Sequence, residues 1–294
     1  MDNRESGNGK GEAAVLPDSR FSIPDSPRYG PQRIVCLTEE PTETLYALGE
    51  QHRIVGISGF TVRPPIARRE KPKVSAFTSA KIGEILALKP DFVVGFSDIQ
   101  SEIAAELIKQ GIEVWISNHR SVQGILDYIR RLGALVGAAD KANAYADRLE
   151  RGLEEIEKAS AQLPRRPKVY FEEWDEPPIT GIRWVAELIR IAGGDDVFPE
   201  LSVEPLAKYR ILADAAVVVQ RAPDIILGSW CGKKFRPEKV AARPGWQAIP
   251  AVRDGELHEI KSPLILQPGP AALTDGVHEM ARIIQAWAAR DRDR

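Results

Sequence analysis

The stretch DKANAYADRLERGLEEIEKASAQL, residues 140–163, divides the chain into two parts of similar size. Its apolar positions recur every three or four residues, which predicts one long amphipathic helix. Asp140 is a suitable N-cap, and Pro164 ends the pattern. A helix of this length spans roughly 36 Å, enough to cross the back of two lobes and fix their spacing. The alternative is an ordinary surface helix of a single doubly wound domain.

The composition limits the class of protein. At 294 residues, with 43% hydrophobic and 28% charged residues, the chain is long enough for two domains or one large one. A net charge of −2, without a basic stripe, argues against a nucleic-acid partner. No apolar run approaches the roughly 18 residues of a membrane span, so we expect no membrane insertion. Cys36 and Cys231 fall in opposite halves, which favours two free thiols over one disulfide.

The N-terminal segment, residues 1–30, is polar and rich in Gly, Pro and Ser, which predicts disorder. It has neither a basic region followed by an apolar core nor a lipoprotein cysteine. With Met1 as the true start, this predicts a cytoplasmic protein. A misassigned start is the alternative, and it would allow a periplasmic protein.

Strand-like and helix-like patterns alternate on both sides of the central helix, which predicts parallel sheets of the α/β class. The segment KPDFVVG at 89–95 also matches APDIILG at 222–228 in residue type at nearly every position. This internal echo favours two lobes built on one plan over a single domain. The expected units are an N-terminal lobe at 31–138, a linking helix at 139–164 and a C-terminal lobe at 165–290.

Several motifs, taken in order, resemble the solute-binding proteins of ABC importers for vitamin B12 and iron siderophores. The matching segments are RIVCL at 33–37, TETLYALG at 42–49, ILALKPD at 85–91, AGGDDVF at 192–198, PGP at 268–270 and DG at 275–276. The stretches 171–178 and 181–185 are similar to the cobalamin-binding branch in particular. The resemblance implies two Rossmann-like lobes joined by a single long helix, with a ligand cleft between them.

The candidate site follows from the rule that ligands bind beyond the carboxyl ends of parallel strands. The first lobe offers Thr38, Glu39, Phe60, Phe77 and Ser97, and the second offers Glu172, Trp174, Arg183, Trp184, Trp230 and Cys231. A corrinoid such as cobalamin is a large, mostly neutral disc edged with amides, and aromatic walls with a few polar groups suit it. A ferric siderophore or haem is the alternative ligand. Its greater negative charge would require more cations than Arg63 and Arg183, although Arg210 could join them.

An enzyme is the third alternative. Cys231 could act as a nucleophile with His258 or His119, and Glu172 and Glu173 as paired acid–base carboxylates. No pattern brings the thiol and an imidazole together, and adjacent strand residues point to opposite faces. The histidines also lack metal-ligand spacing. We therefore expect non-catalytic binding, with no metal site in the protein itself.

Docking to an ABC permease is doubtful on this sequence. The resemblance implies one exposed glutamate on each lobe, but Gly83 occupies the first position and Glu84 lies one residue further along a helix. The second position, counted back from Pro270, falls near Leu266 or Gln267, and neither is acidic. We therefore expect a cytoplasmic corrinoid binder or carrier. The alternative is an importer's solute-binding protein for a ferric siderophore or haem.

Overall fold

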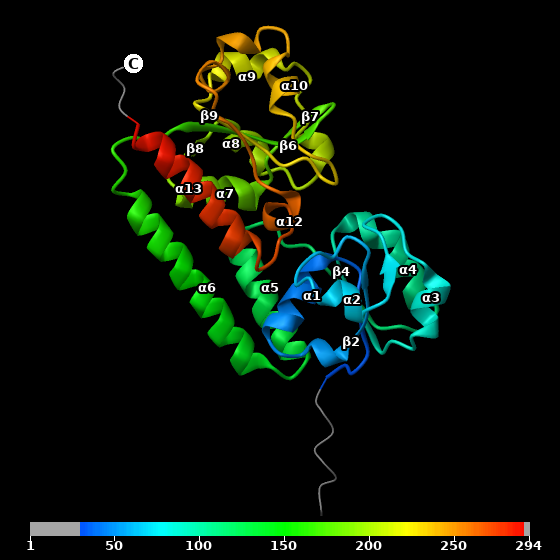
Figure 1. The fold of residues 1–294 in the computed structure, drawn as a ribbon. Helices are drawn as coiled ribbons and strands as arrows, with labels where there is room; N and C mark the ends of the chain where they lie inside the picture. Colours follow the sequence, from blue (N-terminus) through cyan, green and yellow to red (C-terminus); the bar gives the residue numbers. More distant parts are fainter. Residues whose placement is uncertain (1–29, 291–294) are drawn as a thin grey trace, which may run out of the picture.

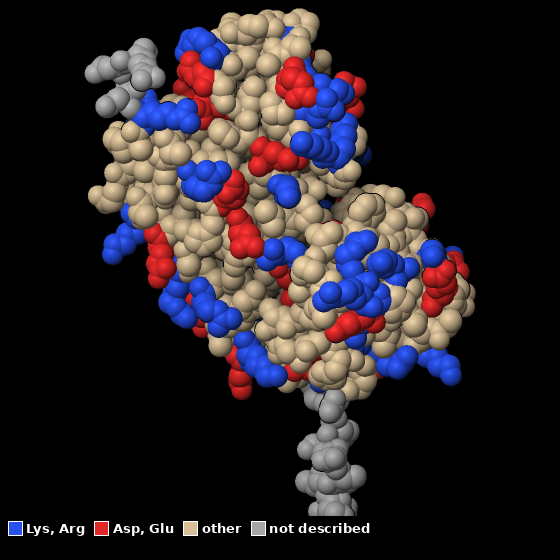
Figure 2. Space-filling model, in the orientation of Figure 1, with Lys and Arg blue, Asp and Glu red and all other residues tan. Residues whose placement is uncertain are grey.

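Two α/β lobes joined by one long helix make up the computed structural model, which describes residues 30–290 (Figure 1). The predicted fold class is confirmed. The segment predicted to be disordered, 1–30, lies outside the described residues except for Gly30. Within the described range, no helix has the length and apolar character that crossing a membrane requires. Charges of both signs are interspersed over the face in Figure 2.

The first lobe is built on a parallel five-stranded sheet in the order β3-β2-β1-β4-β5. Its strands are β1 (Ile34–Cys36), β2 (Ile54–Ser58), β3 (Lys73–Ser75), β4 (Phe92–Phe96) and β5 (Val114–Ser117). Its helices are α1 (Glu39–Ala47), η1 (Gln51–Arg53), α2 (Ala67–Glu70), α3 (Ile82–Ala87), η2 (Asp98–Gln100), α4 (Ser101–Lys109) and α5 (Val122–Leu135). The central strands β1 and β4 are buried along their whole length, as their continuous apolar sequences predict.

The second lobe has strand order β10-β9-β6-β7, with β8 also paired to β6 and β7 antiparallel to it. Its strands are β6 (Lys168–Asp175), β7 (Pro178–Thr180), β8 (Asp195–Asp196), β9 (Ile225–Gly228) and β10 (Leu257–Glu259). Its helices are α7 (Arg183–Ile191), α8 (Pro199–Ser202), η3 (Ala207–Tyr209), α9 (Ala216–Arg221), α10 (Pro237–Ala241), η4 (Trp246–Ala248), α11 (Pro250–Arg253), α12 (Ser262–Ile265), η5 (Ala272–Gly276) and α13 (Val277–Ala288).

The internal echo corresponds to the same turn in both lobes. Lys89 and Ala222 each precede a Pro-Asp pair, and each has φ of 48° in the left-handed region. The Asp91 carboxylate then accepts the Arg33 backbone N–H at 2.8 Å, at the edge of β1. Asp224 accepts the Lys168 backbone N–H at 2.8 Å, at the start of β6. The repeated Pro-Asp turn therefore fixes the first strand of each sheet.

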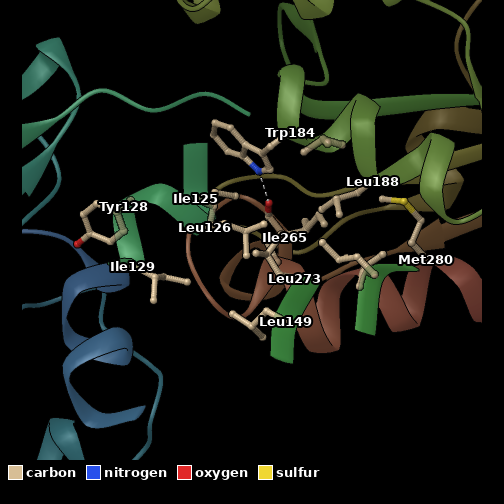
Figure 3. Close-up of a cluster of buried hydrophobic side chains, with 14 of the residues drawn as sticks. Ile125, Leu126, Tyr128, Ile129, Leu149, Trp184, Leu188, Ile265, Leu273 and Met280 are labelled. Atoms are coloured by element: carbon tan, nitrogen blue, oxygen red, sulfur yellow. Dashed lines mark hydrogen bonds between the residues drawn. The ribbon is translucent and has the colours of Figure 1, made fainter. Parts of the chain in front are cut away.

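The linking helix α6 (Ala139–Ser160) begins at Ala139, with Ala138 as its N-cap in place of the expected Asp140. Its apolar stripe is buried against α5, α7 and α13, so both lobes share one core. Figure 3 shows that core, with Leu149 of α6 near Leu126 of α5 and Leu273 of the second lobe. In Figure 1, α6 runs beside both α5 and α13.

Helices α5 and α6 pack closely at Gly133, where an added Cβ would meet the Ala142 Cβ at 2.1 Å. We predict that Gly133→Ala lowers the free energy of unfolding by about 1–3 kcal/mol, because the two helices must move apart. Urea denaturation measures it. Gly152→Ala on α6 is the control, since its Cβ meets no atom within 4 Å. This control should stabilise by about 0.5–1 kcal/mol, and equal effects of the two changes would contradict the explanation.

Candidate functional site

A cavity of about 660 Å³ lies between the two lobes, beyond the carboxyl ends of strands from both sheets. The first lobe contributes residues at or just after the carboxyl end of each of its five strands. The second contributes Glu173 on β6, the residues after β9, and the loops on either side of η3 and after α12. The site therefore lies where the strand-end rule places it.

Most of the predicted residues lie in the wall of this cavity. These are Thr38, Glu39, Phe60, Phe77, Ser97, Trp184 and Cys231. Phe60 is 51% exposed at the surface, whereas Trp184 is only 3% exposed and donates its indole N–H to the Ile265 carbonyl at 2.9 Å (Figure 3). The cavity thus has an aromatic side chain held rigidly in its wall and another that is free to contact a ligand.

Glu172 and Trp230, also predicted, are instead buried inside the second lobe. Glu172 is fully buried, and its carboxylate accepts from both Arg243 Nη atoms at 2.6 and 2.9 Å. It also accepts from the Trp230 indole and the Tyr170 hydroxyl, each at 3.0 Å. Strand β6 continues to Asp175, so Glu172 and Glu173 are strand residues and do not lie in a loop beyond a strand end. Glu172 therefore points into the lobe, and its neighbour Glu173 lines the cavity.

Trp174 and Arg183, the remaining predicted residues, lie outside the cavity wall. The Lys233 ammonium lies 3.9 Å from the centre of the Trp174 ring, and the indole N–H is bonded to the Glu176 carbonyl. Arg183 is more than half exposed and pairs with Glu187 at 2.8 Å. Both side chains are therefore occupied by local partners.

Two arginines face the cavity; Arg120 was not predicted, and Arg210 was considered only as an added cation for an anionic ligand. Arg120 donates to the Ser97 hydroxyl at 3.1 Å, and its guanidinium lies 4.5 Å from the centre of the Phe96 ring. Burial, and the charge of nearby Arg210, lower the pKa of Arg120. Arg210 is 1% exposed and pairs with Glu173 at 2.5 Å. Arg120 follows β5, so the strand-end rule could have identified it.

A group of carboxyl groups begins α1, next to the cavity. Burial, together with the charges of Glu40 and Glu43, raises the pKa of Glu39 to about 8. Burial also raises the pKa of Glu40 to about 7. The Glu40 Oε1 atom accepts the Thr38 hydroxyl at 2.6 Å, while its buried Oε2 has no hydrogen-bond partner among the described residues. Glu39 is therefore largely protonated at neutral pH.

The segment Pro268–Ala271 connects the second lobe to the first, and Pro268 lines the cavity. The Pro268 carbonyl bonds to His119 Nε2 at 2.7 Å, and the Ala271 N–H donates to Glu43 at 3.2 Å. Because a carbonyl can only accept, Nε2 carries the proton. Burial lowers the pKa of His119 to about 4, so the ring stays neutral. His119 is thus a link between the lobes.

The groups suggested for catalysis have other surroundings in the structure. Burial raises the pKa of the Cys231 thiol, and the charges of Glu173 and Glu39 add to the shift. His258 bonds to Glu256 at 2.9 Å in the second lobe. Both cysteines of the chain are free thiols, Cys36 buried and Cys231 exposed. Across residues 30–290, no group of three or more His, Cys, Asp or Glu side chains is placed to hold a metal ion.

We predict that stability depends on pH through Glu40. Folding keeps it protonated up to about pH 7, whereas an unfolded glutamate ionises near 4.5, so the native state loses stability as pH rises between these values. Glu40→Gln removes this loss and should gain about 3 kcal/mol relative to the native sequence between pH 4.5 and pH 8. Urea denaturation at both pH values measures it, with the exposed Glu84→Gln as control. A pH-independent difference would contradict the prediction.

Comparison with known proteins gives matches over nearly the whole described chain. A family model described as periplasmic binding protein matches residues 34–264. A vitamin B12-binding protein of Vibrio parahaemolyticus is 25% identical over 255 residues, covering 82% of this chain and 86% of that one. YvrC of Bacillus subtilis, an uncharacterized ABC transporter substrate-binding lipoprotein, is 24% identical over 269 residues, covering 86% and 80%.

Among solved structures, the periplasmic heme-binding protein RhuT from Roseiflexus sp. RS-1 has a similar fold. Its TM-score is 0.75 at 21% identity, and the match covers 88% of this chain and all of that one. At this identity the likeness establishes the fold and leaves the ligand open.

The cytoplasmic location expected from the sequence is wrong. The matching family is described as periplasmic, and one relative is a substrate-binding lipoprotein of an ABC transporter. The prediction rested on the lack of an export signal in residues 1–30, and a match across 34–264 outweighs that absence. The expectation of a cytoplasmic carrier is withdrawn with it.

Proposed function

The chain belongs to the periplasmic binding protein family, and on this premise we propose that it is the solute-binding protein of an ABC importer. It captures a small molecule outside the cytoplasm and presents it to a permease, without chemical change to the ligand. The observation that carries this proposal is the cavity between the lobes, which is lined from both sheets. The relatives named as vitamin B12-binding and substrate-binding proteins support it.

The ligand we favour is a flat, largely apolar metal chelate such as a corrinoid. Phe60, Phe77, Phe96 and Trp184 line the cavity, and most of its exposed wall is apolar. Such walls bind the faces of a large disc through apolar contact. The polar groups that remain can bond to substituents at its edge.

The charges in the cavity favour a ligand that is close to neutral. Arg210 is paired with Glu173 at 2.5 Å, and Arg120 lies 3.4 Å from Asp98, so Lys208 is the one cation of the wall without an ion pair among the described residues. Glu39 adds little charge at pH 7, since its pKa is about 8. A strongly anionic chelate would instead call for arginines without acidic partners. An amide-edged corrinoid fits this balance better than a ferric catecholate.

Haem is the second candidate, and its support is the fold shared with RhuT. Haem iron in proteins takes a His, Cys, Met or Tyr ligand. Within the described part of the chain, Cys231 is the only residue of these types in the cavity wall, and its raised pKa disfavours the thiolate. A cobalamin carries its own axial ligands, so it needs none from the protein.

The structure also shows where the two positions lie at which the resemblance implies a docking glutamate. Leu266 and Gln267 line the cavity, so the lack of an acid there has no bearing on an outer docking surface. When the two repeats are aligned on Pro90 and Pro223, the residue of the second lobe that corresponds to Gly83 is Ala216. Glu84 is exposed beside Gly83, on the outer helix α3. Neither Gly83 nor Ala216 is acidic, so these positions do not themselves support docking. We include permease docking in the proposed function on the family match and on the ABC transporter relative.

Titration with cyanocobalamin tests the proposal. We expect quenching of tryptophan fluorescence, part of which disappears in Trp184→Phe. Phe60→Ala should weaken binding about tenfold, because about 1.4 kcal/mol of apolar contact is lost. Ile108→Ala is the matched control, since Ile108 is 58% exposed on α4 outside the cavity wall.

The outcome also separates the ligand classes. Haemin binding with a Soret shift that Cys231→Ala removes, in the absence of cyanocobalamin binding, would favour the second candidate. Saturable binding of a ferric hydroxamate alone would assign the siderophore class. Failure of all three ligands to bind would contradict the proposed function.

A further inference from the structure

Glu39 differs from the other acidic groups of the cavity in having no partner. Its carboxyl group lines the cavity and the residue is only 8% exposed, yet it forms no hydrogen bond or ion pair with residues 30–290. Glu173 and Asp98, in the same wall, each pair with an arginine. Because this carboxyl group faces the cavity and has no protein partner, its hydrogen-bonding capacity is left for a molecule in the cavity.

The surroundings of Glu39 are mostly acidic. Glu40 and Glu43 follow it on α1, and the electrostatic influence of Glu39 reaches Cys231 of the other lobe. The charge of Arg68 lowers the pKa of Glu39, but the Arg68 Nη1 atom is itself bonded to the Gly59 and Thr61 carbonyls at 2.8 and 2.7 Å. The other titratable groups in the cavity wall are Asp98, Arg120, Glu173, Lys208 and Arg210.

Two opposing effects set the protonation of Glu39. The N-terminal end of α1 favours a carboxylate, because its unpaired N–H groups carry partial positive charge. Burial and the two neighbouring glutamates favour the protonated form, and they prevail, with a pKa of about 8. At neutral pH the side chain therefore presents one O–H donor and one carbonyl acceptor to the cavity.

We propose that Glu39 is a specificity-determining residue that binds a carboxamide at the edge of the ligand. Its O–H donates to the amide carbonyl, and its carbonyl oxygen accepts an amide N–H. This inference rests on the proposed function and narrows the ligand to chelates edged with amides. An amine at the same place would instead need the carboxylate form of Glu39. Binding of a carboxamide should therefore weaken as pH rises through the pKa of Glu39, whereas binding of an amine should tighten.

The affinity for cyanocobalamin is measured from pH 6 to pH 9.5 in the native protein, Glu39→Gln and Glu39→Ala. Native binding should be constant below about pH 7 and weaken about tenfold per pH unit above 8, as the required proton is lost. Glu39→Gln keeps a donor and an acceptor, so its affinity at pH 7 should stay within about threefold and not follow pH. Glu39→Ala should lose about tenfold at pH 7.

Two results would overturn the inference while leaving the proposed function intact. One is native binding that tightens as pH rises, with Glu39→Gln binding at least tenfold more weakly at pH 7. The other is a native pH profile as flat as that of Glu39→Gln. Glu84→Gln, exposed on α3, is the matched control and should behave as the native protein.

The protonation step can be checked without any ligand. In protein labelled with ¹³C at the glutamate carboxyl, the resonance that Glu39→Gln removes should titrate near pH 8. Titration at the ordinary glutamate value would overturn the inference. If cyanocobalamin does not bind the native protein at pH 7, the corrinoid assignment fails, and this resonance still decides whether Glu39 is a donor.

Discussion

The contact between α5 and α6 is the constraint on which the rest of the structure depends. Gly133 and Ala142 allow these helices to pack closely, and the buried stripe of α6 continues onto α7 and α13. Because both lobes share this core, their relative placement is set by side-chain packing and not by the ligand. The cavity is a consequence of that placement, since it lies where the ends of the two sheets are held apart.

The contact between α1 and the segment Pro268–Ala271 shows how stability and function compete. Glu43 holds the crossing segment through the Ala271 N–H and also pairs with Arg63 at 2.8 Å, so this carboxylate is well satisfied. Glu40 is fully buried against Gly269, where an added Cβ would lie 2.6 Å from the Glu40 Cβ. Three glutamates within one helical turn cannot all ionise cheaply in such a place. Their grouping suits a site that uses a protonated carboxyl group.

Much of the fold was predictable because it depends on local pattern. The period of residues 140–163 gave the linking helix, and the repeated Pro-Asp segment indicated two lobes. The site was predictable only where strand ends were correctly located. Extension of β6 to Asp175 reversed the expected roles of Glu172 and Glu173, since β pairing is decided by partners distant in sequence. Arg210 enters the cavity from η3, which no strand rule locates.

The segment Pro268–Ala271 has a kinetic consequence. His119 and Glu43 of the first lobe form hydrogen bonds to this segment of the second lobe. The lobes are therefore joined beside the cavity as well as through α6. Such a molecule spends little conformational entropy on closing around its ligand. Ligand capture then proceeds without waiting for a slow domain movement, and discrimination between similar ligands appears mainly in how long each stays bound.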